Sequence, residues 1–246
     1  MKKLLIFVLL LIGLPVFSLE EYTTEYFQNL TDEEAVELIY NQNKHIDKFT
    51  TKEFEIFYTN LKNFLQHRDI EIKASAPFHS EIMDETDAYL AIDYEYLYKH
   101  SKNLSKEWKQ FLYLKTIPYK KQKEKCSFSV AYNVITMPQK DLPNLLKRER
   151  KYILNNPSFS QIDEIKKDYQ THFEHLISNG YTFNNWNNDI DKDSIKMWKI
   201  FLRTFPKNTK EYITIQDWYN VIQRNNYQKT DEVLDYLHAI DKTIFY

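Results

Sequence analysis

Apolar residues recur every three or four positions through most of this chain. The clearest case lies between residues 54 and 65, where the large side chains that share one helical face are Phe54, Phe57, Leu61, Phe64 and Leu65. This spacing is typical of an amphipathic helix that buries a single stripe. Residues 162–176 and 195–202 have the same period, so we expect helices there as well.

Short polar motifs mark where the first helices begin. Thr31 is followed by Glu34, and Thr50 by Glu53, so each pair has the spacing of a capping box. The two helices that follow are expected to form an antiparallel hairpin. Later helices are expected over residues 81–100, 105–117, 143–155, 160–179, 194–205, 209–225 and 230–246.

Prolines separate several of these expected helices. Pro118 and Pro206 each follow one, because proline disfavours helical geometry in the residue before it. Residues 119–142 lack a helical period, and we expect an irregular connection there between two halves, 19–118 and 143–246. The sequence therefore predicts an all-α protein built from antiparallel helix pairs.

Residues 1–18 have the three parts of a secretory signal peptide. Two lysines precede an apolar run, and Val16 and Ser18 occupy the −3 and −1 positions of a signal-peptidase site. The run is shorter than the roughly 20 residues that span a bilayer. We expect cleavage before Leu19, export to the periplasm or the medium, and no transmembrane segment in the mature chain. The single cysteine, Cys126, lies far from this site, so we do not expect a lipoprotein.

Composition narrows the possible folds and partners. Only two glycines occur in 246 residues, whereas tight hairpins and phosphate-binding loops need residues that adopt positive φ easily. β-Sandwiches, Rossmann units and P-loops are therefore disfavoured. The formal net charge is −2, which argues against a nucleic-acid partner held by phosphate neutralisation.

The C-terminal half contains two similar stretches of sequence, each centred on a proline. Placing Pro157 on Pro206 pairs Tyr152 with Phe201, Asp168 with Asp217, and Tyr169 with Trp218. Such helix, proline, helix units resemble the tetratricopeptide-like repeats of bacterial envelope proteins. The resemblance implies a short, irregular helical solenoid that offers a groove to a partner. The alternative is an ordinary helix bundle, because antiparallel helix pairs resemble one another wherever helices pack.

Asp189, Asp191 and Asp193 alternate ahead of an expected helix and are candidate calcium ligands. Carboxylates converge on calcium in EF-hand loops, but Ser194 and Ile200 stand where such a loop needs glycine and a bidentate acid. The alternative is that Asp193 or Ser194 caps the helix, with the other acids near its positive end. We favour the capping interpretation.

His172 and His175 are a second metal candidate, because residues three apart lie on one face of a helix. Zinc usually takes three or four protein ligands, and no other His or Cys cluster lies nearby in the sequence. We therefore favour solvated or partly packed histidines, and we expect no metal and no cofactor.

Aromatic residues supply the remaining hint of a binding site. Tyr181, Phe183 and Trp186 fall in a polar loop and are candidates for an exposed patch that binds a peptide or a glycan. The other tryptophans lie on apolar stripes that are typical of a core.

These observations favour an exported, non-enzymatic binding or scaffold protein of the cell envelope, whose partner is a protein or an envelope polymer. No nucleophile elbow is possible with so little glycine, and no catalytic residues are assigned. The alternative is an envelope hydrolase that acts on cell-wall material. It requires two carboxylates in a cleft between the halves, with raised pKa values.

Overall fold

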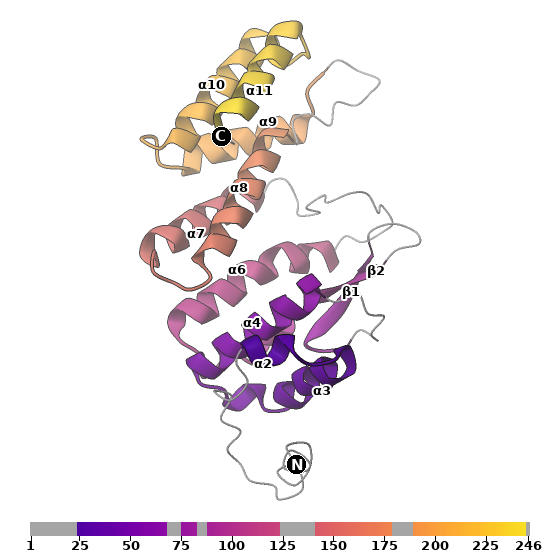
Figure 1. Ribbon diagram of the computed structural model, residues 1–246. Helices are drawn as coiled ribbons and strands as arrows, with labels where there is room; N and C mark the ends of the chain where they lie inside the picture. The colour runs from indigo at the N-terminus through magenta and orange to yellow at the C-terminus, as the bar shows by residue number, and fades with distance from the viewer. Residues whose placement is uncertain (1–23, 68–74, 83–87, 124–140, 179–188, 245–246) are drawn as a thin grey trace, which may run out of the picture. The chain divides into compact units, whose positions relative to one another are not determined.

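The computed structural model describes residues 24–67, 75–82, 88–123, 141–178 and 189–244. These residues are mostly helical, which confirms the expected all-α class, and they include one short antiparallel pair of strands (Figure 1). The chain divides into two compact units, residues 1–109 and 110–246, which are considered in turn.

Several sequence-based expectations lie outside the described residues. These are the signal peptide over residues 1–18, residues 124–140 of the expected irregular connection, and the loop that contains Tyr181, Phe183 and Trp186. They remain predictions.

The N-terminal unit consists of helices and one strand pair. Its elements are α2 (Thr24–Gln28), α3 (Asp32–Asn43), the 3₁₀ turn η2 (Ile46–Lys48), α4 (Thr51–His67), β1 (Phe78–Ile82), β2 (Ala88–Ile92) and α5 (Tyr94–Lys99). The next helix, α6 (Lys106–Lys123), begins in this unit and continues into the second.

Both capping boxes form as the sequence predicts. Thr31 N donates to the Glu34 side chain at 2.9 Å, and Glu34 N donates to Thr31 Oγ1 at 3.3 Å, which opens α3. Thr50 and Glu53 make the same reciprocal bonds, at 2.7 and 3.3 Å, ahead of α4. The two helices that they open pack on each other.

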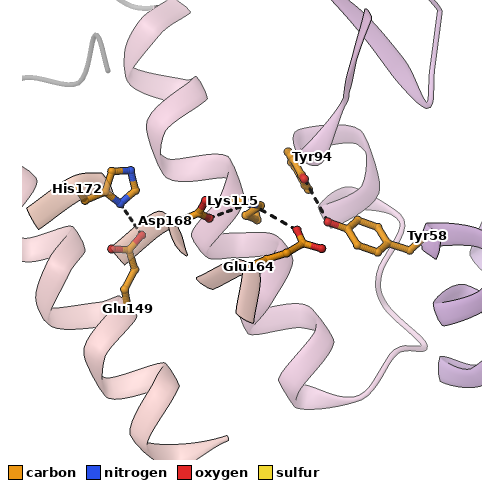
Figure 2. Close-up of polar contacts among 7 residues, drawn as sticks. All are labelled: Tyr58, Tyr94, Lys115, Glu149, Glu164, Asp168 and His172. Carbon is orange, nitrogen blue, oxygen red and sulfur yellow. Dashed lines mark hydrogen bonds and ion pairs between the residues drawn. The ribbon is translucent and has the colours of Figure 1, made fainter. Parts of the chain in front are cut away.

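Aromatic residues of α4 form the core of this unit together with Trp108. Phe54 and Tyr58 are fully buried, and their rings meet the Trp108 ring edge to face at 5.1 and 5.2 Å. The hydroxyl groups of Tyr58 and Tyr94 lie 3.1 Å apart and join α4 to α5 (Figure 2). The stripe predicted from the spacing of α4 is therefore the one that the fold buries.

The prediction of a single helix over residues 81–100 is wrong. β1 and β2 pair antiparallel there, with Phe78 opposite Ile92, and both of these side chains are buried. The Phe78 ring lies 5.6 Å from the ring of Phe64 on α4. Burial against α4 thus decides the conformation, because strand preference depends on packing more than on local sequence.

The helical part of this segment begins later than expected. Asp93 caps α5 by accepting a hydrogen bond from Tyr96 N at 2.9 Å, so the helix starts at Tyr94. Tyr89, Ile92 and Tyr96, which are three and four residues apart on the two sides of this cap, have the spacing of a single helix.

The expected helix end before Pro118 is also wrong, because α6 contains Pro118 in its interior. Proline there removes one helical hydrogen bond and crowds the preceding turn, at a cost of about 3 kcal/mol. Phe111, Leu112 and Thr116 are buried on the turns before it. This tertiary packing holds the helix in register through the proline, and residues 119–123 are helical instead of part of a connection.

The C-terminal unit continues with five helices among the residues described. They are α7 (Leu142–Asn155), α8 (Ile162–Ser178), α9 (Lys192–Thr204), α10 (Lys210–Arg224) and α11 (Asp231–Ile244). Each packs on the next along the chain, and α7 also packs on α9. Contacts between helices that are neighbours and between helices two apart are typical of a stacked helical array.

Large rings connect these helices. The Trp198 ring meets Trp218 edge to face at 5.8 Å, and Trp218 stacks on Tyr236 of α11 at 6.1 Å. Trp198 also donates its indole N–H to the carbonyl of Leu176 on α8 at 2.7 Å. One buried residue of α9 thereby touches both its preceding and its following helix.

No helix among the residues described is both long enough and apolar enough to cross a membrane.

Candidate functional site

A groove lies between α8 and α10, with a volume of about 300 Å³. Its lining residues, which we call the α8–α10 groove, are Lys166, Tyr169, Gln170 and Phe173 of α8 and Lys210, Glu211 and Thr214 of α10. Both helices belong to the C-terminal unit. The groove combines two aromatic rings with cationic, anionic and neutral polar groups, so it offers both apolar surface and hydrogen-bonding groups to a ligand.

A hydrogen bond joins the two helices at the buried side of the groove. The hydroxyl of Tyr169 donates to Glu211 Oε1 at 2.9 Å. Burial, and then the charge of Glu211, raise the pKa of Tyr169, so the phenol stays protonated and keeps donating. Beside it, Phe173 is buried and lies 6.2 Å from Phe201 of α9. This side of the groove is therefore built on the packed core.

The rim of the groove carries the two lysines, one from each helix. Lys166 forms an ion pair with Asp163 at 2.7 Å, in which the side chains are 54% and 88% exposed. Exposed pairs of this kind contribute little stability. Lys210 lies in the first turn of α10, directly after the N-cap Thr209. Each lysine is therefore positioned by the regular backbone of the helix that carries it.

A buried pair of polar side chains joins α7 and α8. Nδ1 of His172 lies 2.8 Å from Oε1 of Glu149 on α7, and the side chains are only 8% and 2% exposed (Figure 2). Oε2 of Glu149 has no hydrogen-bond partner among the residues described. Desolvation raises the pKa of Glu149, although its hydrogen bond to His172 and the charge of that ring oppose the shift.

Lys115 of α6 forms ion pairs with two acidic residues of α8 near this pair. Its ammonium lies 2.7 Å from Asp168 Oδ2 and 3.7 Å from Glu164 Oε2, and the lysine side chain is 14% exposed (Figure 2). The charge of Asp168 raises the pKa of Glu149, and the charge of Lys115 lowers it. These groups act on one another electrostatically and tie α6, α7 and α8 together.

α8 therefore has two polar faces with different roles. The groove face carries Lys166, Tyr169, Gln170 and Phe173, whereas the interior face carries Glu164, Asp168 and His172. The groove face offers hydrogen-bonding and charged groups to a ligand. The Glu149–His172 pair is enclosed by protein, so its chemistry is that of a structural pair.

The alternating acids cap α9 through a residue other than the ones expected. Asp191 is the N-cap, and its carboxylate accepts hydrogen bonds from the backbone N–H groups of Asp193 and Ser194 at 3.1 and 3.0 Å. Asp193 pairs with Lys196 at 2.8 Å, and Asp189 forms an isolated bridge with Gln228. Asp191 lies two residues before Asp193, at the position from which its carboxylate reaches two N–H groups of the first turn.

The histidine candidates also have specific surroundings. His172 faces Glu149, and the pKa of His175 is lowered by burial and by the charge of His172. Within the residues described, no group of three or more His, Cys, Asp or Glu side chains is placed to hold a metal ion.

Sequence reasoning missed Glu149 and the groove lysines. Glu149 lies among the buried residues of α7, whose other members are Leu142, Pro143, Leu145, Leu146 and Tyr152. A carboxylate on an apolar stripe is a signal for a buried polar contact. Lys166 and Lys210 carry no such signal, because only the folded unit brings residues of α8 and α10 to one groove.

No protein-family model, curated protein or solved structure matches this chain.

Proposed function

We propose that this chain is an exported, non-enzymatic binding protein of the cell envelope, and that its C-terminal helical stack is the part that binds a partner. The observation that carries this proposal is the α8–α10 groove, in which polar and charged side chains line a hollow between two helices of the stack. The overlapping contacts of α7 to α11 support a solenoid-like scaffold of the tetratricopeptide-like kind.

Burial argues for binding over the hydrolase alternative. A glycoside hydrolase needs an acid that reaches the substrate. Among the residues described, the carboxyl whose pKa is raised is Glu149, which is 2% exposed and faces His172 in the interior of its unit. The groove itself contains one carboxylate, Glu211, which is engaged by Tyr169.

Export is tested by the mass of the mature chain. We expect the protein from the periplasm or the medium to begin at Leu19, because Val16 and Ser18 precede that residue at the cleavage positions. Mass spectrometry of the N-terminal peptide measures this directly. A chain that retains residues 1–18 in the cytoplasmic fraction would contradict export.

Binding at the groove is tested by photo-crosslinking in the envelope fraction. A photoreactive phenylalanine at position 170 is expected to give a defined crosslinked product, because Gln170 lines the groove. The substitution Thr214→Trp, which fills the groove, is expected to remove that product.

The matched control places the same photoreactive group at Lys151, an exposed position of α7 outside the groove. Lys151→Trp serves as the control for Thr214→Trp. Equal products from positions 151 and 170, or a product that survives Thr214→Trp but not Lys151→Trp, would count against the proposal.

A further inference from the structure

We propose that the α8–α10 groove binds an acidic segment of a polypeptide partner, with a carboxylate between Lys166 and Lys210 and an aliphatic side chain on the ring of Tyr169. This inference rests on the binding function proposed above and adds the chemistry of the ligand.

The charges of the lining residues favour an anion. The groove has two ammonium groups and one carboxylate, Glu211. One oxygen of that carboxylate already accepts the hydroxyl of Tyr169 at 2.9 Å. The lysines come from opposite walls of the groove, so a ligand carboxylate is attracted by both.

Lys166 is able to turn to a ligand at small cost. Its partner Asp163 is three residues earlier on the same helix, and the pair is mostly exposed. Water and salt weaken such a pair, so exchanging Asp163 for a ligand carboxylate in a partly enclosed groove is favourable.

Apolar surface near the groove suits a side chain next to the acid. Tyr169 lines the groove, and Ile213 of α10, which is not one of the lining residues, follows Lys210 by three positions and is 54% exposed. An exposed isoleucine of this size gains from being covered. The partner segment is therefore expected to place aliphatic residues beside its acids.

The groove is small and open to solvent at its exposed lysines, so a bound segment of a chain can continue along the helices outside it. About 300 Å³ is the lower end of the range for ligand pockets. It accommodates one or two side chains, while the rest of an extended segment lies along the helices outside the groove. A free carboxylic acid would make only the contacts to the lysines.

The test uses the purified exported chain and a fluorescein-labelled peptide of alternating glutamate and leucine, followed by fluorescence anisotropy. The same peptide with glutamine in place of glutamate is the ligand control. We expect the acidic peptide to bind at least about tenfold more tightly, and added salt to weaken its binding.

Variants locate the binding within the groove. The double charge reversal K166E/K210E is expected to weaken binding of the acidic peptide by about tenfold or more. The matched control K151E/K199E reverses two exposed lysines of α7 and α9 outside the groove and is expected to leave binding unchanged. Circular dichroism confirms that both variants are folded.

Glu211→Gln tests the sign of the charge separately. Glutamine still accepts the hydrogen bond from Tyr169, and the loss of negative charge is expected to strengthen binding of the acidic peptide several-fold. Weaker binding by E211Q would mean that the ligand contributes a cation there, which would overturn the proposal.

Two further outcomes separate this inference from the proposed function. If position-specific crosslinking occurs but the acidic and glutamine peptides bind equally, the ligand chemistry is wrong and the binding function stands. If free glutarate competes as well as the acidic peptide at equal concentration, the ligand is a small carboxylate and the polypeptide assignment is overturned.

Discussion

Replacing His172 with alanine is expected to destabilise the C-terminal unit by about 3–5 kcal/mol, because it leaves the Glu149 carboxyl buried without its partner. The two side chains are 8% and 2% exposed, so water cannot replace the lost hydrogen bond without opening the helices. Urea unfolding followed by circular dichroism measures the change. The matched control is Glu174→Ala on the same helix, which is expected to change stability by less than about 0.5 kcal/mol.

Glu149→Gln tests the electrostatic part of this effect. Glutamine keeps a hydrogen-bonding group beside His172 Nδ1 and removes the carboxyl whose pKa burial raises. A carboxyl with a raised folded pKa favours folding most below the unfolded value of about 4.5, and that contribution is lost as pH rises through the folded pKa.

The stability of E149Q relative to the native chain should therefore increase as pH rises from about 4.5 toward neutrality. The difference between the two proteins reports the titration of Glu149 together with its interactions with His172, Asp168 and Lys115. A difference that stays constant with pH would show that Glu149 does not titrate in this way.

Trp198→Ala is expected to cost about 3–5 kcal/mol, because it removes a fully buried ring from the centre of the helical stack. The ring contacts Trp218 of α10 and donates to the carbonyl of Leu176 on α8. Its loss therefore weakens the connections of α9 on both sides. Thermal unfolding and urea unfolding both report the change.

Trp198→Phe separates the ring from its hydrogen bond. Phenylalanine retains an aromatic side chain but leaves the Leu176 carbonyl without the indole donor, at an expected cost of about 1–3 kcal/mol. Lys199→Ala, at the next and exposed position, is the control and is expected to change stability by less than about 0.5 kcal/mol. Equal losses for W198F and W198A would mean that the hydrogen bond dominates.

Both predictions bear on the proposed binding function. α8 carries His172 on its interior face and groove residues such as Tyr169 and Phe173 on another. Changes that loosen the interior face should weaken binding only by unfolding the unit, whereas K166E/K210E should weaken binding with stability retained. Measuring affinity and stability on the same variants separates the two effects.

Features that depend on neighbouring residues were predictable. The capping boxes form because Thr31 and Glu34 are three residues apart, and the stripe of α4 is buried because its spacing places Phe54 and Leu61 on one face. The same reasoning predicted the all-α class. Near the acids before α9 it identified the cap but chose Asp193 or Ser194 in place of Asp191.

Features that depend on distant residues were not predictable in this way. The pairing of Phe78 with Ile92 is stabilised against α4, and α6 continues through Pro118 because its earlier turns are buried. In both cases the free energy of tertiary packing outweighed a local preference that pointed the other way.

The amino-acid order thus determines where most helices of this protein begin and which side chains each one buries, because caps and helical periodicity act within a few residues. Tertiary packing alone decides the site. Tyr169 and Glu211, and likewise Glu149 and His172, belong to different helices. Their chemistry arises only when the helices meet, since burial and hydrogen bonding across an interface depend on the position of both partners.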